Sequence, residues 1–158
     1  MSTGREIERK FLVDGELPPD LDDRPCEPIS QGYISIDRDG TEVRLRAKGG
    51  RHTLGVKSGP SRTRVEEEIE VDERCFGSLW PLTEGRRIEK RRFAIPADDG
   101  LSIELDVYDG DLSGLVTAEV EFSSERDADA FEPPSWLGSD VTGDARYSNQ
   151  SLAEHGRA

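Results

Sequence analysis

Residues 6–13 of the chain read Glu6-Ile7-Glu8-Arg9-Lys10-Phe11-Leu12-Val13. In an extended strand, successive side chains point to opposite faces of the sheet. Glu6, Glu8 and Lys10 would therefore share one face, and the intervening, mostly apolar residues would share the other. Taken alone, this pattern fits either a charged face in solvent or a charged face that forms a binding site. How often the pattern recurs along the chain bears on the choice.

The same alternation recurs in seven further segments, which we predict to be strands. Turns such as Asp37–Gly40, typical of tight hairpins, separate many of them. Short helices are predicted over 73–80 and 124–131, with a third in the C-terminal tail. Residues 14–28, rich in Pro, Asp and Gly, are predicted as a loop. The seven segments are residues 31–36, 41–48, 52–57, 62–71, 87–95, 101–108 and 116–122.

Eight strands with few short helices predict an α+β, mostly β fold. We expect one domain over residues 1–158, because the chain has the length of one domain and no long linker. We expect the antiparallel sheet to close on itself as an eight-stranded barrel. Two arrangements are then open. Either the apolar face fills the barrel and the charges face solvent, or the charges line a lumen and the short helices pack outside on the apolar face.

Charges of the same sign gather strand by strand on the charged faces. Like charges two residues apart on a strand lie about 7 Å from each other, and they repel by about 2 kcal/mol at an effective dielectric of 20. A solvated face tolerates this repulsion, whereas an enclosed face needs opposing strands of opposite sign or a charged ligand. The sorting by sign, and the need of the amphipathic helices for a surface, favour the charged lumen. The clusters are Glu6 and Glu8; Arg44 and Arg46; Arg62 and Arg64; Glu66, Glu68 and Glu70; Lys90 and Arg92; Glu104 and Asp106; and Glu119 and Glu121.

The net charge of −13 limits the classes of partner. A general nucleic-acid binder or an anionic-membrane binder is not expected, because neither partner would be attracted electrostatically. The two cysteines, Cys26 and Cys75, fit neither a disulfide framework nor a metal-binding spacing. With no signal peptide or transmembrane run recognised, we expect a reduced, cytoplasmic protein. The acidic excess fits adaptation to high salt and compositional drift in a GC-rich genome equally well.

A charged lumen would bring two kinds of group together. Arginine and lysine side chains can bind several phosphate groups, and arginine can do so in a bidentate manner. Clustered carboxylates are hard oxygen ligands suited to Mg²⁺ or Mn²⁺. A chamber that offers both would hold a metal-complexed polyphosphate.

The opening motif Glu6-x-Glu8-x-Lys10 resembles the signature of the CYTH superfamily, the triphosphate tunnel metalloenzymes. Further charged motifs follow in the order of that family over nearly the whole chain, which looks most like the small bacterial inorganic triphosphatases. The resemblance implies an eight-stranded tunnel with a charged lumen. It also implies divalent-metal-dependent hydrolysis of a triphosphate, with inorganic tripolyphosphate favoured. The later motifs are Arg44-x-Arg46, Lys57, Arg64-x-Glu66-x-Glu68, Lys90-x-Arg92, Glu104-x-Asp106 and Glu119-x-Glu121.

By this resemblance each group of charged residues has an expected role, with water attacking directly and no covalent enzyme intermediate. The ligands of Mg²⁺ or Mn²⁺ would be Glu6, Glu8, Asp106, Glu119 and Glu121. The phosphate-binding residues would be Lys10, Arg44, Arg46, Lys57, Arg64, Lys90 and Arg92. The supporting carboxylates would be Glu66, Glu68 and Glu104. The candidates for the catalytic step are Glu8, Lys57 and Arg92.

Other activities stay open on the sequence alone. The substrate could be a thiamine or nucleoside triphosphate. An adenylate cyclase of the same fold would instead make cyclic AMP from ATP. A binding protein would hold polyphosphate or nucleotides without turnover. In each case the partner is a small molecule rather than nucleic acid or a membrane, and a homodimer is left open.

Overall fold

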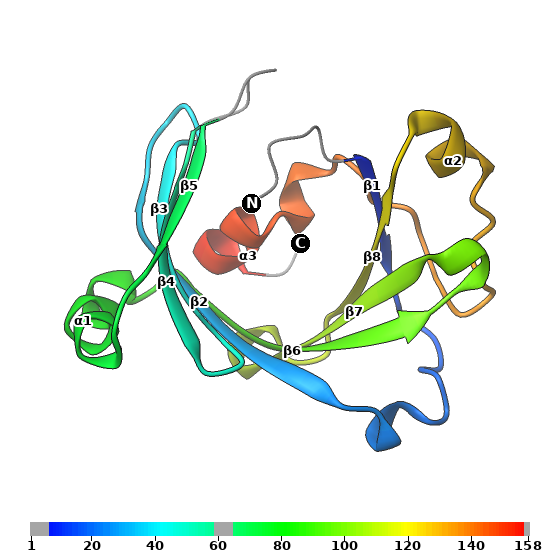
Figure 1. Ribbon diagram of the computed structural model, residues 1–158, viewed down its shortest axis with the longest axis horizontal. Coiled ribbons are helices and arrows are strands. Elements are labelled where there is room, and N and C mark those ends of the chain that lie inside the picture. Colours follow the sequence, from blue (N-terminus) through cyan, green and yellow to red (C-terminus); the bar gives the residue numbers. More distant parts are fainter. Residues whose placement is uncertain (1–6, 59–64, 157–158) are drawn as a thin grey trace.

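The computed structural model describes residues 7–58 and 65–156. Eight strands form one sheet in the order β1-β8-β7-β6-β2-β3-β4-β5, and every pairing in it is antiparallel. The sheet is strongly curved and has a concave and a convex side (Figure 1). The mostly β architecture predicted from the sequence is thereby confirmed. The strands are β1 (Ile7–Leu12), β2 (Cys26–Ile36), β3 (Glu42–Lys48), β4 (Arg51–Lys57), β5 (Glu66–Glu70), β6 (Arg87–Pro96), β7 (Ser102–Asp109) and β8 (Val116–Phe122).

The strand register places the predicted charged residues on one face of the sheet. Residues that lie directly opposite each other on antiparallel neighbours point to the same side. Arg92 of β6 lies opposite Asp106 of β7, and Lys10 of β1 lies opposite Glu119 of β8. This face is the concave one, because the helix that lies within the curve contacts Lys90 through Asn149 (Figure 1).

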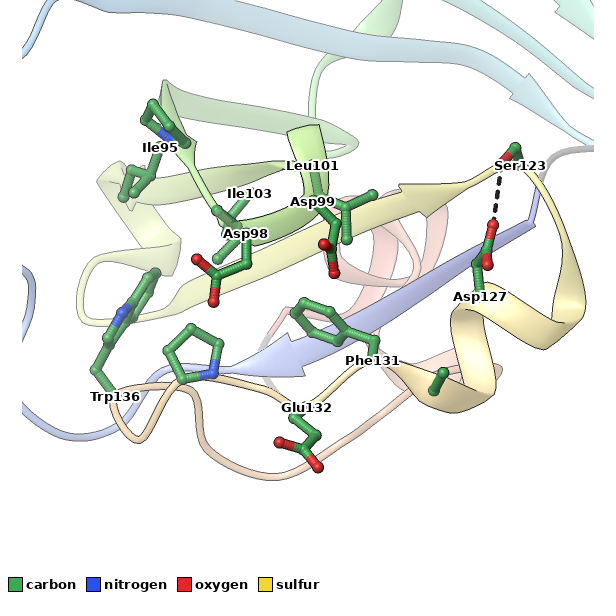
Figure 2. A pocket seen from close by; sticks show the side chains of 14 residues that line it. Ile95, Asp98, Asp99, Leu101, Ile103, Ser123, Asp127, Phe131, Glu132 and Trp136 are labelled. Carbon is green, nitrogen blue, oxygen red and sulfur yellow. Dashed lines mark hydrogen bonds between the residues drawn. The ribbon is translucent and has the colours of Figure 1, made fainter.

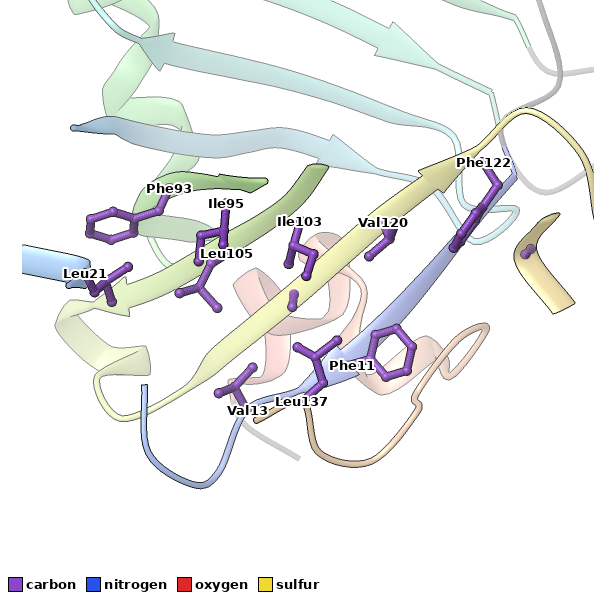
Figure 3. Close-up of a cluster of buried hydrophobic side chains, with 12 residues drawn as sticks. Phe11, Val13, Leu21, Phe93, Ile95, Ile103, Leu105, Val120, Phe122 and Leu137 are labelled. Atoms are coloured by element: carbon purple, nitrogen blue, oxygen red, sulfur yellow. The ribbon is translucent and has the colours of Figure 1, made fainter. Parts of the chain in front are cut away.

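The convex side carries the larger apolar core, whose residues come from the intervening positions of the strands. Phe11, Leu105 and Val120 are among its buried side chains (Figure 3). Fully burying a side chain of this size contributes about 1.5–3 kcal/mol. The larger apolar core therefore lies on the outside of the curve, and the charged positions of the strands lie on the inside.

Two helices cover the convex side, as predicted for the short helices. Helix α1 (Glu73–Leu79) begins after Asp72, whose carboxylate accepts a hydrogen bond from Cys75 N, and Phe76 contacts His52 of β4 at a ring-centroid distance of 4.8 Å. Helix α2 (Glu125–Ala130) packs on β1 and β8. Arg9 of β1 donates to the carbonyl of Ala128 at 2.9 Å, which satisfies a group at the end of that helix. Within the described residues, no helix combines the length and apolarity needed to cross a membrane.

Helix α3 (Asn149–His155) is an exception to the prediction that the helices pack outside. It lies on the concave side of the sheet (Figure 1). The reason is that the concave face is not charged along its whole length. Tyr33, Ile88 and Tyr108 form an apolar cluster there with Leu152 and Ala153 of the helix.

The prediction of a closed barrel is wrong for the structure as described. Strands β1 and β5 are the two edges of the sheet, and no ladder joins them within the described residues. The free edge of β1 is instead taken by the tail: Leu12 N donates to Ser139 O at 2.9 Å, and Val141 N donates to Lys10 O at 2.8 Å. Because these backbone groups are already paired, β5 cannot pair with them.

The predicted loop over residues 14–28 is too long at its C-terminal end. Strand β2 begins at Cys26, which lies opposite Phe93 of β6. The composition signal was misleading because Pro28 occurs inside the strand, where Gly49 N donates to its carbonyl at 3.3 Å. A proline is compatible with a strand where its missing N–H is not needed for the ladder.

Gly32 marks a close approach between β2 and the 3₁₀ turn η2 (Trp80–Thr83). A Cβ atom on Gly32 would lie 2.6 Å from both Cβ and Oγ1 of the buried Thr83. We therefore expect Gly32→Ala to lower the free energy of unfolding by about 1–3 kcal/mol, as overpacking does in other cores, measured by urea denaturation. Gly77→Ala in α1 is the matched control, because its Cβ would meet nothing within 4 Å. Equal effects of the two substitutions would contradict this account.

Candidate active site

A buried carboxylate holds two cations at the centre of the concave face. Asp106 of β7 accepts from Lys90 Nζ at 2.8 Å and from Arg92 Nε at 2.8 Å, and Arg92 Nη2 reaches its second oxygen at 3.0 Å. Only 3% of Lys90 and 2% of Asp106 is exposed. Arg92 also lies 3.2 Å from Glu104. The group therefore places two cations beside one buried carboxylate, Asp106, and one partly exposed carboxylate, Glu104.

Burial and charge oppose each other at Asp106. Burial raises the pKa of its carboxyl, but the hydrogen bond from Arg92 and the charges of Lys90 and Arg92 outweigh burial and hold this pKa below its usual value. For Arg92, burial lowers the pKa, and the hydrogen bond and charge of Asp106 raise it above the usual value overall. Both partners are therefore ionised at neutral pH.

A second basic group lies on β3. Arg44 is within 3.4 Å of Glu66 and 3.8 Å of Glu68 on β5, so two of the predicted supporting carboxylates lie beside a basic side chain. Lys57 of β4 lies opposite Glu42 and Glu66 in the register. Burial raises the pKa of the Glu42 carboxyl, although nearby Arg44 and Lys57 lower it.

Carboxylates gather where β1, β8 and β7 meet. Glu8 lies opposite Glu121, and Glu104 lies opposite Glu119. Lys10 Nζ lies 3.5 Å from Glu119 and also donates to the backbone carbonyl of Tyr147. The acidic strands thus adjoin the Lys90–Asp106–Arg92 group, which lies on the next strand pair.

The donor chemistry of this acidic edge fits a hard divalent cation. Within residues 7–58 and 65–156, no three carboxylate, thiol or imidazole groups lie close enough together to hold a metal ion. Mg²⁺ is typically bound through one or two carboxylates together with water and substrate phosphates, rather than by a cage of protein ligands. Facing glutamates such as Glu8 and Glu121 match that mode.

The structure describes most of the predicted site residues and places them on one face. Glu6 and Arg64 lie outside the described residues, as does Arg62. Asp106, predicted as a metal ligand, accepts from Lys90 and Arg92 in this structure. The described members of the predicted set on the concave face are Glu8, Lys10, Arg44, Arg46, Lys57, Glu66, Glu68, Lys90, Arg92, Glu104, Asp106, Glu119 and Glu121.

Sequence reasoning missed the neutral polar residues of this face. Gln31 contacts Arg46 at 2.8 Å, Asn149 contacts Tyr108 at 3.2 Å, and Gln150 contacts Glu42 at 3.3 Å. The alternation of its strand could have identified Gln31 from the sequence, because it places Gln31 on the same face as Tyr33. Asn149 and Gln150 were missed because their helix was expected to lie outside the sheet.

A separate hollow lies on the convex side, between the β6–β7 hairpin and α2 (Figure 2). Apolar side chains such as Ile103, Phe131 and Trp136 line it, together with the carboxylates Asp98 and Asp99. None of its lining residues is basic. It is therefore unsuited to an anionic ligand, and the concave face remains the candidate site.

No known family model matches the chain. An inorganic triphosphatase of Nitrosomonas europaea is 47% identical over 152 residues, which cover 94% of this chain and 96% of that protein. An inorganic triphosphatase of Acetivibrio thermocellus is 38% identical over 155 residues, which cover 96% and 95%. The crystal structure of the inorganic triphosphatase NE1496 shares 43% identity, covers 99% of each chain and has a TM-score of 0.79.

These relatives confirm the resemblance to the small bacterial inorganic triphosphatases, and the eight-stranded antiparallel sheet with its charged concave face agrees with it. Identity of this level extends over nearly the full length of both relatives. The chain therefore belongs to the inorganic triphosphatase family.

Proposed function

We propose that the chain hydrolyses a small-molecule triphosphate, with inorganic tripolyphosphate as the preferred substrate, and releases phosphate. The observation that carries this proposal is the concave face, where the basic group around Asp106 adjoins an acidic edge on β1 and β8. The names of the relatives support the same activity. A triphosphate complexed with a divalent cation has the charge pattern that matches both parts of the face.

The basic residues of the concave face bind and orient the triphosphate in this proposal. Lys90 and Arg92 are positioned by Asp106, so their side chains need little reordering when an anion binds. Preorganised cations stabilise the charge that develops on the transferred phosphoryl group and the leaving group. The residues assigned to this role are Lys10, Arg44, Arg46, Lys57, Lys90 and Arg92, together with Arg64 as predicted from the sequence.

Mg²⁺ or Mn²⁺ is the cofactor of the proposed reaction. A bound divalent cation offsets phosphate charge and lowers the pKa of an attacking water. Glu8, Glu119 and Glu121 would hold it, with Glu6 as predicted from the sequence. Asp106 has a different role in this proposal, because both of its oxygens accept from cations and it positions Lys90 and Arg92.

Among the catalytic candidates, Arg92 and Lys57 would stabilise charge on the phosphoryl and leaving groups. Glu8 would take part by holding the divalent cation. The reaction is proposed to take place in the cytoplasm, as expected from the sequence, and Cys26 and Cys75 are free cysteines in the structure.

The test is phosphate release from tripolyphosphate, ATP, GTP and thiamine triphosphate with Mg²⁺, with Mn²⁺ and with excess chelator. We expect the fastest release from tripolyphosphate and none with the chelator. Cyclic AMP as the product from ATP would establish a cyclase instead, and tight binding without any turnover would establish a binding protein. Either result would contradict the proposal.

Substitutions at the acidic edge test the site itself. We expect Glu8→Gln and Glu121→Gln each to reduce metal-dependent phosphate release by about 100-fold or more, because each removes an anionic oxygen ligand. Both residues are exposed, so the midpoint of urea unfolding should change little. Glu67→Gln, on the opposite face of β5, is the matched control and should retain activity. Near-normal turnover in both site variants would show that the assignment is wrong.

A further inference from the structure

We propose that Gln31 is a positioning residue, which orients the guanidinium of Arg46 for a substrate phosphate without neutralising its charge. This inference rests on the proposed triphosphate hydrolysis. Gln31 lies on β2, between β6 and β3, and its neighbours in the register are Ile88 and Arg46. It therefore points to the concave face, and its side chain is fully buried, with 0% exposed.

Gln31 is held in one orientation by two hydrogen bonds. Arg46 Nε donates to Gln31 Oε1 at 2.8 Å, and Gln31 Nε2 donates to Tyr33 Oη at 2.6 Å. An arginine Nε can only donate, so the carbonyl oxygen of the amide must face it and the amino group must face the tyrosine. Burial raises the pKa of Tyr33 to about 12, so this hydroxyl stays neutral and accepts. The chain Tyr33–Gln31–Arg46 therefore has a single hydrogen-bonding pattern.

Arg46 differs from the other arginines of this face in how its charge is balanced. Arg44 lies within 4 Å of three carboxylates, and Arg92 forms ion pairs with Glu104 and Asp106. In the described part of the chain, Arg46 forms no ion pair within 4 Å. Burial lowers its pKa, as does the positive charge of Arg44, and Glu68 opposes them from a longer distance. The positive charge of Arg46 is therefore less closely balanced than those of Arg44 and Arg92, and an anion would supply a nearer counter-charge.

A neutral acceptor suits this task better than a carboxylate. A glutamate at position 31 would form an ion pair with Arg46 and compete with a phosphate for its charge. The Gln31 amide fixes the plane of the guanidinium through Nε, and the terminal amino groups then supply the paired donors that bind phosphate oxygens. Gln31 thus acts through Arg46, and its contribution should disappear when Arg46 is absent.

A double-mutant cycle tests this dependence. We expect Arg46→Met to lower kcat/KM for tripolyphosphate by about 100- to 1000-fold, as loss of a charge-stabilising donor does, and Gln31→Leu to lower it by about 10- to 100-fold through misplacement of the guanidinium. Adding Gln31→Leu to Arg46→Met should cost less than about threefold more. Gln31→Glu should also lose activity, although it keeps an acceptor. If the two losses multiply, or if Gln31→Glu matches the wild type, the inference is wrong.

Two further measurements separate the possible failures. Tyr33→Phe removes the partner of the Gln31 amide with little change in volume, and it should cause a smaller loss that also vanishes beside Arg46→Met; this variant serves if Gln31→Leu does not fold. Calorimetric binding of tripolyphosphate reports on the inference without turnover. If the wild type binds tripolyphosphate without hydrolysing it, and Gln31→Leu binds it more weakly, only the proposed function is contradicted. Turnover and binding that are independent of Gln31 would contradict only this inference, and a wild type that neither binds nor hydrolyses tripolyphosphate would contradict both.

Discussion

Replacing Asp106 with alanine is expected to lower the free energy of unfolding by about 3–5 kcal/mol, the range found when one partner of a buried ion pair is removed. The substitution leaves Lys90 buried without its 2.8 Å partner and removes both contacts to Arg92. Urea denaturation at neutral pH measures the change. Asp109→Ala is the matched control, because its ion pair with Arg91 is on the surface, with side chains 48% and 44% exposed. Such pairs contribute about 0–1 kcal/mol, and a similar loss in both variants would contradict the account.

The effect of pH on this stabilisation has a definite direction. The pKa of Asp106 is lower in the folded protein than its usual value. The stability contributed by its charge is therefore fully present above the unfolded pKa, about 3.9, and is lost as the pH falls through the lower folded value. The difference in stability between wild type and Asp106→Ala should narrow only in that acid range.

Arg92→Gln is expected to reduce kcat/KM for tripolyphosphate by about 100- to 1000-fold, as loss of a preorganised charge-stabilising group does. Arg92 is the one described arginine that contacts both of the β7 carboxylates on the concave face, Glu104 and Asp106. Those contacts direct its planar guanidinium along the concave face and raise its pKa, so the positive charge is present at any working pH. Glutamine keeps a hydrogen-bonding side chain and removes the charge, and activity should be compared per folded molecule after urea denaturation.

Strand alternation predicted the faces of the sheet well. The two-residue spacing of Lys90 and Arg92, or of Glu119 and Glu121, depends only on local backbone geometry, so it can be read without knowledge of the fold. Long-range pairing could not be read in that way. Nothing local indicates that residues 138–141 pair with the edge of β1 at Lys10 and Leu12, which leaves those backbone groups unavailable to another strand.

For the candidate site, too, the sequence predicted the local features and not the long-range contacts. Charge type and spacing located the residues of the concave face, but not which of them pair with each other. Asp106 and Glu119 look equivalent in the sequence, yet burial between Lys90 and Arg92 gives Asp106 a different environment. Gln31 is neutral, so a search for charges passed over it, although its burial and its contact with Arg46 make it a part of the site.

In the proposed function, the concave face of the sheet performs the chemistry. Arg91 and Arg92 are consecutive residues of β6 and point to opposite faces, so they form a natural matched pair. The most direct measurement is phosphate release from tripolyphosphate by Arg92→Gln and by Arg91→Gln, with Mg²⁺ and at equal folded concentration. The account predicts a loss of about 100- to 1000-fold for Arg92→Gln and activity within about twofold of wild type for Arg91→Gln, whose ion pair is on the surface. Equal activities of the two variants, or a larger loss for Arg91→Gln, would contradict it.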